Sequence, residues 1–338
     1  MKEPKVIAFD RRLGVGDIIS SLPALYVIKQ LYPKAKLLLF TSKVGFYLCK
    51  NFDFIDRIFL QGLELTQNDE NLPQIIDEYN IDTLILAHRT SKNIKFAKQS
   101  KCKNIITWWH LHTLFSPRFK HPKHIKRLKR LEIQRCLDLV RMIDPKLYDA
   151  KIKEFDLKTM PIQIQSDREN IEHISAFLKP IQKDFKYIIG LSCFGISSAY
   201  YNLKMSDWIV LVKALAGRFK NFLFIFMNFK QSGYEFEDFK EENIKVFNND
   251  ENLLHLVELT RRLKLCISLS TGNIHIADNL KIDTLGFYPQ TDSMLFPCGN
   301  YGGHFDALFL PKDWHNEYEF YKDEFYKLAQ DILSKFEE

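Results

Sequence analysis

A cluster of small polar residues and one histidine follows a short apolar run near residue 270. The segment 265–280 reads LCISLSTGNIHIADNL, and its first five residues predict a strand, while the Ser-Thr-Gly-Asn run 270–273 predicts a tight turn that caps a helix. Hydroxyls, backbone N–H groups and the helix dipole at such a turn favour an anion, so we expect a phosphate site. His275 follows Thr271 by about one helical turn and can reach the same side. An ordinary strand-to-helix connection with a capping Ser or Thr and a surface histidine is the alternative.

A second candidate turn lies near the start of the chain. The apolar run 6–9 predicts a strand, and a helical pattern covers 18–31. Between them, Gly14 and Gly16 allow the backbone to come close to a bound group, and Asp17 stands at the start of the expected helix. The carboxylate is either a helix cap or a reactive group, and the pattern alone leaves both roles open.

Strands and helices alternate on both sides of these turns. This alternation predicts two doubly wound α/β domains, 1–165 and 166–338, with a cleft between them that both candidate turns face. In the first half we expect strands at 6–9, 37–40, 57–60, 83–87 and 104–107, a loop at 117–123, a helix at 128–143 and a crossing between the halves at 144–167. In the second half we expect strands at 187–191, 222–226, 244–247, 265–269 and 284–287, with helices at 206–219, 253–263, 274–279 and 316–336.

The composition is that of a soluble globular protein. The chain has 338 residues, of which 46% are hydrophobic and 27% charged, and no apolar run approaches the ~18 residues that span a bilayer. The N-terminus lacks a signal-peptide pattern, so we expect a cytoplasmic protein. Six scattered cysteines without a C-x-x-C pair indicate free thiols and no metal site.

The net charge of +6 is unevenly distributed. Between Asp82 and Glu132 no carboxylate occurs, and apolar residues interleave with a set of Lys and Arg residues. The field of such a block attracts a phosphorylated ligand, nucleic acid or an anionic membrane face, and the interleaved apolar side chains favour a greasy anionic molecule. A solvated basic surface without a partner is the alternative. The basic residues are Arg89, Lys92, Lys95, Lys98, Lys101, Lys103, Arg118, Lys120, Lys123, Lys126, Arg127, Lys129 and Arg130.

Three segments resemble motifs of glycosyltransferase family 9, the lipopolysaccharide heptosyltransferases. GVGDIISSLPAL at 14–25 is similar to the family's N-terminal signature, STGNIHIA at 270–277 to its Asp/Ser-Thr-Gly-x-x-His motif, and PQTDSMLFP at 289–297 to the Gly-Pro-Thr-Asp segment that follows. The three occur in the family's order and cover nearly the whole chain.

The resemblance implies a GT-B fold and an inverting, metal-independent transfer. The donor would be a nucleotide diphosphate sugar, ADP-heptose in this family, bound mainly by the C-terminal domain. The acceptor would be the lipid-linked inner core of lipopolysaccharide, bound by the N-terminal domain at the cytoplasmic face of the inner membrane. The absence of a D-x-D pair agrees with metal independence, and no cofactor is expected.

Asp17 matches the position of the family's proposed base, which would deprotonate the acceptor hydroxyl. The resemblance also implies that the turn after residue 269 holds the diphosphate and that the loop 195–198 offers hydroxyl groups to the diphosphate. It further implies that the nucleotide base lies near residue 251, where a helix-capping role is the alternative. Ser270 stands where many members have Asp, and Tyr201 where a basic residue is common. The expected donor residues are Ser197, Ser198, Ser270, Thr271, Gly272, His275, Glu251 and Asn252. We further expect acceptor contacts from Gly16, His88, Arg89, Lys126 and Arg127, although His88 and Arg89 also fit a plain surface pair.

Other function classes stay open at this point. A transferase for another nucleotide sugar, such as a UDP-hexose or UDP-GlcNAc, fits the same motifs, as does a non-catalytic relative that binds anionic glycans. A nucleic-acid-binding protein would use the basic block, but no RNA-binding or helix-turn-helix signature accompanies it. A nicotinamide-dependent oxidoreductase would need a G-x-G-x-x-G turn, which the chain lacks.

Overall fold

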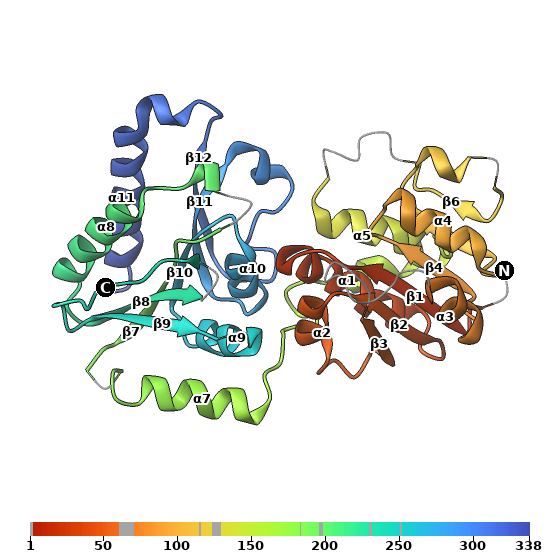
Figure 1. Cartoon of the computed structure of the whole chain (residues 1–338), viewed down its shortest axis with the longest axis horizontal. Coiled ribbons are helices and arrows are strands. Elements are labelled where there is room, and N and C mark those ends of the chain that lie inside the picture. Colours follow the sequence, from red (N-terminus) through yellow and green to blue (C-terminus); the bar gives the residue numbers. More distant parts are fainter. Residues whose placement is uncertain are drawn as a thin grey trace. The chain divides into compact units, whose positions relative to one another are not determined.

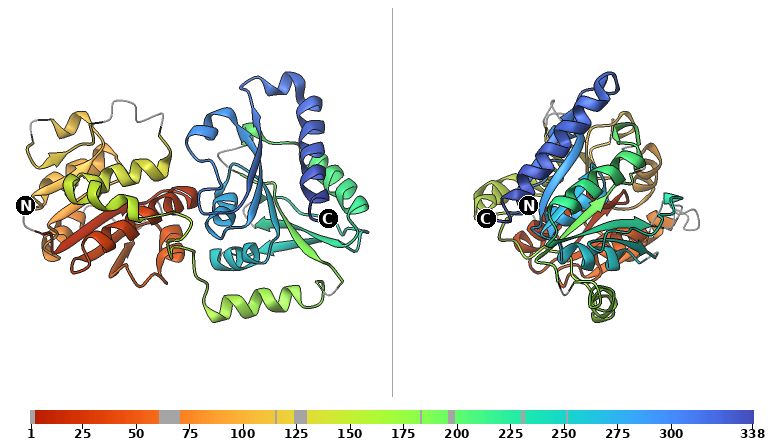
Figure 2. Two further views of the ribbon diagram at one scale, coloured as in Figure 1. Left: turned by 180° about the vertical axis from the view of Figure 1, so that it is seen from behind. Right: turned by 90° about the vertical axis from the view of Figure 1, so that its left-hand side faces the viewer.

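The chain divides into two compact units, Met1–Gln165 and Ser166–Glu338. The structure is a computed structural model and describes residues 3–60, 71–114, 116–123, 130–182, 184–195, 199–229, 232–250 and 252–338. The described strands form one parallel six-stranded sheet in each unit, with helices on both faces of each sheet (Figures 1 and 2). The predicted doubly wound α/β architecture is therefore confirmed.

In the N-terminal unit the strand order is β3-β2-β1-β4-β5-β6. Strand β1 is covered on both faces, since Ile7, Ala8 and Phe9 are fully buried, which is why its first four residues are all apolar. Helices α3 and α4 pack on one face of the sheet, and α1 packs with α5. The elements are β1 (Val6–Arg11), α1 (Val15–Leu31), β2 (Lys36–Thr41), α2 (Lys43–Cys49), β3 (Arg57–Leu60), α3 (Leu72–Glu78), β4 (Thr83–Leu86), α4 (Ser91–Gln99), β5 (Asn104–Thr107), the 3-10 turn η2 (Leu111–Thr113), β6 (Phe119–Lys120), α5 (Glu132–Arg141), α6 (Pro145–Lys151) and η4 (Ile152–Glu154).

In the C-terminal unit the order is β12-β11-β10-β7-β8-β9. Helices α8 and α11 share a hydrophobic core with the inner strands, including Trp208, Phe325 and Phe287. The elements are α7 (Arg168–Leu178), β7 (Tyr187–Ser192), η5 (Ala199–Tyr201), α8 (Met205–Arg218), β8 (Phe222–Phe229), β9 (Ile244–Asn249), α9 (Leu253–Arg261), β10 (Leu265–Leu269), α10 (Gly272–Asn279), β11 (Asp283–Pro289), η7 (Gln290–Met294), β12 (Phe305–Leu310), η8 (Trp314–Glu317) and α11 (Tyr318–Ser334).

Both sheets reverse the direction of their strand order once. In the N-terminal unit the reversal lies between β1 and β4, and in the C-terminal unit between β7 and β10. Ligands of open α/β sheets bind beyond the carboxyl ends of the strands at such a reversal. The Asp17 turn follows β1 and the Ser270 turn follows β10, so each candidate turn stands at this place in its own unit.

The structure differs from the sequence-based expectations in several elements, among them helix α7 (Arg168–Leu178), which was not expected. Helix α1 begins at Val15, not at residue 18, and α5 begins at Glu132, not at 128. Strand β6 lies in the expected loop 117–123, α6 lies in the expected crossing, and β12 was not expected at all. In the described part of the chain, no helix combines the length and apolar character that crossing a membrane requires.

Candidate active site

Asp17 lies in the first turn of α1. Gly14 is the N-cap residue, with an extended backbone, so Asp17 is the third residue of the helix and the alternative that it caps a helix beginning at Ile18 is wrong. The physical reason is that Val15 and Gly16 already adopt helical geometry, so the turn after β1 is shorter than the two glycines suggested.

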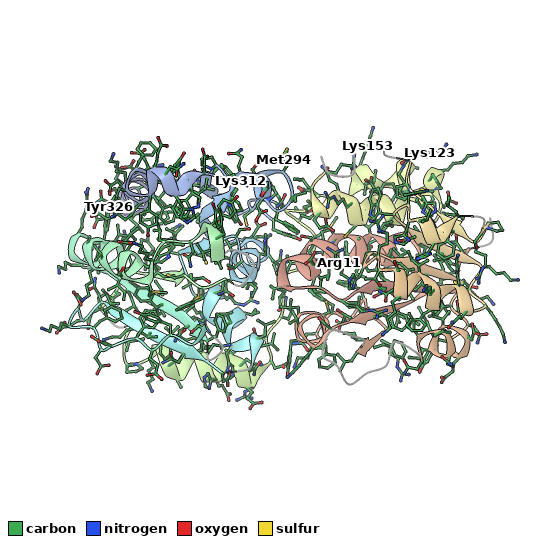
Figure 3. All side chains as sticks on the ribbon, turned by 45° about the horizontal axis from the view of Figure 1, so that its top comes forward. Arg11, Lys123, Lys153, Met294, Lys312 and Tyr326 are labelled. Atoms are coloured by element: carbon green, nitrogen blue, oxygen red, sulfur yellow. The ribbon has the colours of Figure 1, made fainter. Side chains whose placement is uncertain are left out.

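Arg11, the last residue of β1, binds the Asp17 carboxylate. One terminal nitrogen of its guanidinium lies 2.5 Å from Asp17 Oδ1 and 2.8 Å from Glu132 Oε1, and its Nε donates to the Asp17 carbonyl at 3.3 Å. Glu132 opens α5 and also accepts from Arg135 at 2.8 Å. The Arg11 side chain is 4% exposed and the Asp17 side chain 25%. Figure 3 labels Arg11 within the N-terminal unit. Asp17 is thus fixed in orientation by Arg11 and still open to a ligand.

The surroundings of Asp17 favour its protonated form more than water does. Burial raises the pKa of Asp17 above the ordinary value, the Arg11 guanidinium lowers it, and the Glu132 carboxylate raises it again. The pKa of His88 is lowered by burial, and Asp17 is among the groups that act on it. A carboxylate with a raised pKa is a stronger base than an ordinary Asp, which is the property that proton abstraction from a hydroxyl needs.

His88 follows β4 at the same reversal of strand order, so the structure brings two predicted site residues together. Its Nδ1 is buried and has no hydrogen-bond partner among the described residues. A buried imidazole nitrogen without a partner costs free energy unless a water or ligand satisfies it. Arg89 donates to the Trp109 carbonyl and is half-buried, and Gly16 is half-buried in the first turn of α1. The expected acceptor contacts of all three stay predictions.

Residues that sequence reasoning missed hold this edge of the sheet. Arg12 binds Asp10 through two hydrogen bonds of 2.6 and 2.8 Å, and Asn93 of α4 donates to Asp10 at 3.4 Å and to the His88 carbonyl at 3.0 Å. Because side chains alternate along a strand, Asp10 and Arg12 face α4 while Arg11 faces α1 and α5. The signal in the sequence is the run of three charged residues, Asp10, Arg11 and Arg12, directly after the apolar run 6–9.

In the C-terminal unit, Thr271 is the N-cap residue of α10. Its hydroxyl lies 3.2 Å from the Ser268 hydroxyl, and its side chain makes no capping hydrogen bond in the described part of the structure. Thr271 therefore occupies the N-cap position without the side-chain capping hydrogen bond that the alternative requires. The first N–H groups of a helix have no intrahelical partner, so a turn without a side-chain cap is suited to an anion.

Contacts across long sequence separations complete this turn. The Ser270 hydroxyl donates to Asp292 Oδ2 at 2.5 Å, and Asn273 Nδ2 donates to Ser192 Oγ at the end of β7 at 2.7 Å. The first contact joins the STGN motif to the PQTD motif. The second ties α10 to the strand on the other side of the reversal. The two C-terminal motifs thus form one site, with Ser192 as a member that the sequence did not reveal.

His275 lies on α10 but is not a surface residue. It is 8% exposed, the centroid of its ring lies 5.7 Å from that of Phe296, and burial lowers its pKa to about 4. The surface-histidine alternative is wrong because the helix turns this face toward the core. At neutral pH the ring carries no charge, so a contact with a diphosphate would be a hydrogen bond and not an ion pair.

Asn252 serves as the N-cap of α9, since its side chain accepts from the Leu254 amide at 3.0 Å. It also donates to Asn170 of α7 at 2.7 Å. The capping alternative is confirmed for Asn252, and its contact with a nucleotide stays a prediction. The expected site residues Ser197, Ser198, Glu251, Lys126 and Arg127 lie outside the described residues.

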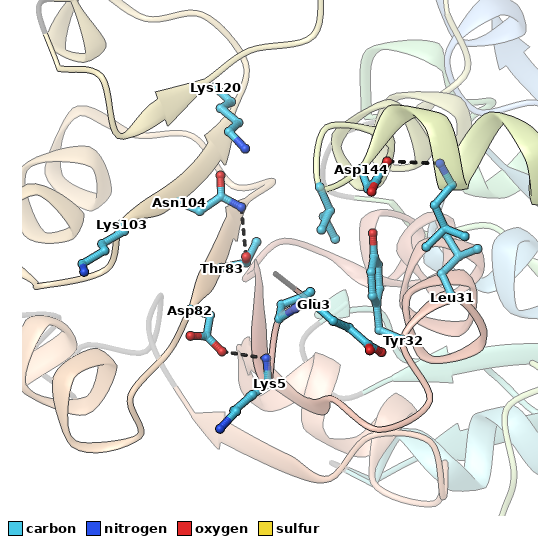
Figure 4. A pocket seen from close by; sticks show the side chains of 13 residues that line it. Glu3, Lys5, Leu31, Tyr32, Asp82, Thr83, Lys103, Asn104, Lys120 and Asp144 are labelled. Carbon is cyan, nitrogen blue, oxygen red and sulfur yellow. Dashed lines mark hydrogen bonds between the residues drawn. The ribbon is translucent and has the colours of Figure 1, made fainter. Parts of the chain in front are cut away.

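A cavity of about 590 Å³ lies in the N-terminal unit, but not at Asp17. Its lining includes Lys5, Asp82 and Asn104, which stand at the amino-terminal ends of the strands, and Tyr32 at the end of α1 (Figure 4). Because a helix rises 1.5 Å per residue, Tyr32 lies roughly 22 Å along α1 from Asp17. The cavity belongs to the opposite edge of the sheet and is not the expected acceptor site.

Within the described residues, no group of three or more His, Cys, Asp and Glu side chains could hold a metal ion, and all six cysteines are free and buried.

Known proteins resemble the chain over most of its length. No family model matches it. A Haemophilus influenzae protein named "Putative glycosyltransferase" is 24% identical over 289 residues, which cover 82% of this chain and 81% of that protein. Escherichia coli ADP-heptose lipopolysaccharide heptosyltransferase II superposes with a TM-score of 0.75 at 12% identity, covering 99% of this chain and 100% of the other.

Two further solved structures agree. A glycosyl transferase family 9 protein from Veillonella parvula has a TM-score of 0.73 at 14% identity, covering 96% of this chain and 90% of its own. E. coli heptosyltransferase WaaC with ADP has a TM-score of 0.60 at 16% identity, covering 95% of this chain and 99% of the other. These comparisons confirm the resemblance found in the sequence motifs, and the chain has the GT-B fold of the family 9 glycosyltransferases.

Proposed function

We propose that this protein is an inverting, metal-independent glycosyltransferase that moves a sugar from a nucleotide diphosphate donor to a lipid-linked anionic saccharide. The proposed donor is ADP-heptose and the proposed acceptor is the lipopolysaccharide inner core. In support, two similar proteins are named as heptosyltransferases, one of them as an ADP-heptose lipopolysaccharide heptosyltransferase. The proposed place of action is the cytoplasmic face of the inner membrane, with peripheral contact to its surface.

The observation that carries the proposal is the environment of Asp17. Burial raises the pKa of this carboxylate, Arg11 fixes its direction, and a quarter of the side chain is exposed at the reversal of strand order. In the proposed step the acceptor hydroxyl loses its proton to Asp17 while its oxygen forms a bond to the anomeric carbon. The bond from that carbon to the diphosphate breaks, its electron pair leaves with the diphosphate, and the configuration inverts.

The leaving diphosphate gains negative charge and needs donors. We assign this role to the backbone N–H groups of Thr271 and Gly272 at the start of α10, because a helix N-terminus stabilises an anion without a metal ion. His275 would add a neutral hydrogen bond. Ser270, held by Asp292, and Ser192, held by Asn273, complete the rim of the turn.

Asp17→Asn tests the base. We expect turnover to fall by about 10²- to 10⁴-fold, the usual contribution of a general base, with donor affinity unchanged. Asp53→Asn is the matched control, since Asp53 is an exposed carboxylate of the same unit and its loss should leave the rate unaltered. Equal activity of Asp17→Asn and the wild type would remove Asp17 from the mechanism.

Gly272→Pro tests the diphosphate turn with a single missing N–H. Gly272 is the first residue of α10, where proline is tolerated, and Thr271 before it is extended (φ −134°, ψ 174°), as a residue before proline must be. We expect affinity for the donor's nucleoside diphosphate to fall roughly tenfold or more, the value of one hydrogen bond to a charged group. Gly272→Ala keeps the N–H and should bind normally, and equal binding by both variants would refute the assignment.

The donor is identified by thermal shift with ADP, UDP, GDP and NAD, because a ligand that binds only the folded state raises the unfolding temperature. We expect stabilisation by ADP. Stabilisation by UDP alone would assign a different nucleotide sugar, and no response to any nucleotide or nucleotide sugar would favour a non-catalytic binding protein.

A further inference from the structure

The segment Trp109–Leu114, which we name the apolar loop, exposes large hydrophobic side chains. Trp109 is 58% exposed, Leu111 64% and Leu114 39%. Single exposed hydrophobic residues are common on soluble proteins, but three within six residues form a patch, and such patches mark contact surfaces. The neighbouring Trp108 is 4% exposed, so the chain turns one tryptophan into the core and presents the next to the outside.

Local hydrogen bonds fix the shape of the apolar loop. His110 Nδ1 accepts from the His112 amide at 3.1 Å, and the Thr113 hydroxyl donates to the His110 carbonyl at 2.5 Å. Arg89 donates to the Trp109 carbonyl, and the Ser91 hydroxyl lies 3.4 Å from His110 Nε2. Polar groups of the loop are therefore satisfied by the loop itself and by the start of α4, and its apolar side chains are held outward.

The surface around the apolar loop is positive. Helix α4 lies beside η2 and exposes Lys92 and Lys95, while the sequence has no carboxylate between Asp82 and Glu132. The pKa of His110 is lowered by burial and by its neighbours Arg89 and His112. Lys123, which projects from the surface of the same unit in Figure 3, adds to this charge.

The combination of exposed apolar side chains and surrounding cations fits the surface of an anionic lipid bilayer. A bilayer that contains anionic phospholipids offers negative headgroups to the lysines and an apolar layer directly beneath them, and tryptophan prefers that boundary. A nucleic acid would satisfy the charge but would leave Leu111 and Leu114 in contact with phosphates or water.

The position of the apolar loop in the fold links it to Asp17. The loop follows the carboxyl end of β5, which pairs with β4, and β4 pairs with β1 in parallel register. Asp17 follows β1 and His88 follows β4, so the apolar loop and both site residues lie at the same edge of one sheet. A membrane bound by the loop would therefore face the edge that carries the candidate base.

We propose that the apolar loop inserts into the headgroup region of an anionic phospholipid bilayer, with the lysines of α4 at its surface, and so presents the Asp17 edge to a membrane-borne acceptor. Only the identity of that acceptor rests on the proposed function; the binding to lipid does not.

Tryptophan fluorescence measures the insertion directly. Trp109 is the exposed tryptophan, whereas Trp108, Trp208 and Trp314 are at most 4% exposed, so a change of polarity at the surface reports on Trp109. With phosphatidylglycerol/phosphatidylcholine vesicles we expect a blue shift and quenching by brominated acyl chains, and neither with pure phosphatidylcholine. Absence of the blue shift with anionic vesicles would overturn the proposal.

Variants separate the apolar and electrostatic parts. In vesicle sedimentation, Trp109→Ser with Leu111→Ser should abolish binding, while Lys92→Gln and Lys95→Gln should each weaken it roughly fivefold, the effect of one charge near an anionic surface. Val210→Ser is the control, because Val210 is 66% exposed in the other unit. Equal loss of binding in the control and the double variant would refute a role specific to the loop.

Activity assays distinguish this proposal from the proposed function. Asp17→Asn should bind vesicles like the wild type. On an acceptor stripped of its acyl chains, the double variant should keep the wild-type kcat and KM; a raised KM on that substrate would show that the loop binds the saccharide instead and would overturn the membrane assignment. Failure of all sugar transfer with intact vesicle binding would refute only the enzymatic proposal.

Discussion

Arg11→Met is the substitution that tests the Asp17 site most directly. The Arg11 guanidinium bridges Asp17 and Glu132 from a side chain that is 4% exposed. Methionine has a similar length and no charge, so the variant leaves two carboxylates side by side without the cation between them. Glu132 keeps its partner Arg135 at 2.8 Å. The variant should therefore fold, but with a less stable N-terminal unit.

The expected cost follows from the geometry. Because one Arg11 nitrogen lies 2.5 Å from Asp17 Oδ1 and 2.8 Å from Glu132 Oε1, those two oxygens are at most about 5 Å apart, and two unit charges at that distance repel by roughly 3 kcal/mol at an effective dielectric constant near 20. Removing one partner of a buried ion pair usually costs about 3–5 kcal/mol. Since Asp17 is 25% exposed, we expect the lower end, about 3 kcal/mol.

Urea unfolding at pH 7.5 and pH 5 provides the assay. The pKa of Asp17 is already raised, and loss of Arg11 removes the main influence that lowers it. In the folded variant Asp17 therefore takes up a proton more readily than in the unfolded chain. The loss of unfolding free energy caused by Arg11→Met is full at high pH and shrinks as the pH falls through the pKa of Asp17 in the folded variant. Combining Arg11→Met with Glu132→Gln should restore part of the lost stability, because the repulsion between Glu132 and Asp17 disappears.

Arg141→Met is the control for this experiment. Arg141 belongs to α5 of the same unit and pairs with Asp149, but the two side chains are 41% and 50% exposed, so the loss should stay below about 1 kcal/mol. If Arg11→Met cost no more than Arg141→Met, or if its cost were the same at both pH values, the reasoning about the Arg11 bridge would be wrong.

Three further predictions address single groups. Glu132→Gln removes a charge that raises the pKa of Asp17, so the acid limb of the pH profile of kcat/KM should move to lower pH. If this limb did not move, Glu132 would have no influence on the pKa of the catalytic base. The Tyr32 hydroxyl is buried without a hydrogen-bond partner among the described residues. In thermal unfolding, Tyr32→Phe should therefore leave stability unchanged or increase it by up to about 1 kcal/mol. A clear loss of stability would indicate that a water or ligand binds this hydroxyl. Burial raises the pKa of Asp278 to about 6, so ionisation of this carboxyl group destabilises the folded state. As the pH rises from 4 to 7, Asp278→Asn should therefore gain stability relative to the wild type, by roughly 3 kcal/mol at most. Parallel curves of unfolding free energy against pH for the two proteins would refute this.

The main strands could be predicted because buried parallel strands leave a strong local signal. The run 265–269 is buried throughout, has one polar residue, Ser268, and ends at small turn residues. Strand β6 has only two residues, Phe119 and Lys120, and no periodicity can be read from so short a segment. Strand β12 is apolar but stands at the sheet edge, where five of its six residues are only partly buried, and a short apolar run does not distinguish a strand from a helix.

The candidate site could be predicted only as far as local turns reach. Asp17 and the Ser270 turn are found by reading a few residues on either side of a strand end. The groups that set their chemistry come from far away in the chain: Glu132 is 121 residues from Arg11, and Ser192 is 81 from Asn273. A single sequence does not encode those distant pairings in a local pattern, so only the folded chain shows that Arg11 bridges Asp17 and Glu132.

The proposed role of Asp17 as a base is supported by the sign of one effect in its surroundings, the shift of its pKa. A carboxylate that caps a helix is stabilised by amides, and its pKa falls. Here Gly14 is the N-cap residue, and burial outweighs Arg11 and a backbone hydrogen bond with Gly14, which both lower the pKa of Asp17, so that the pKa rises. The same burial that strengthens Asp17 as a base destabilises its charged form, and Arg11 offsets part of that cost while fixing the direction of the carboxylate. A group whose environment opposes its own charge contributes little to folding by that charge, and this agrees with the proposed role of Asp17 in proton transfer.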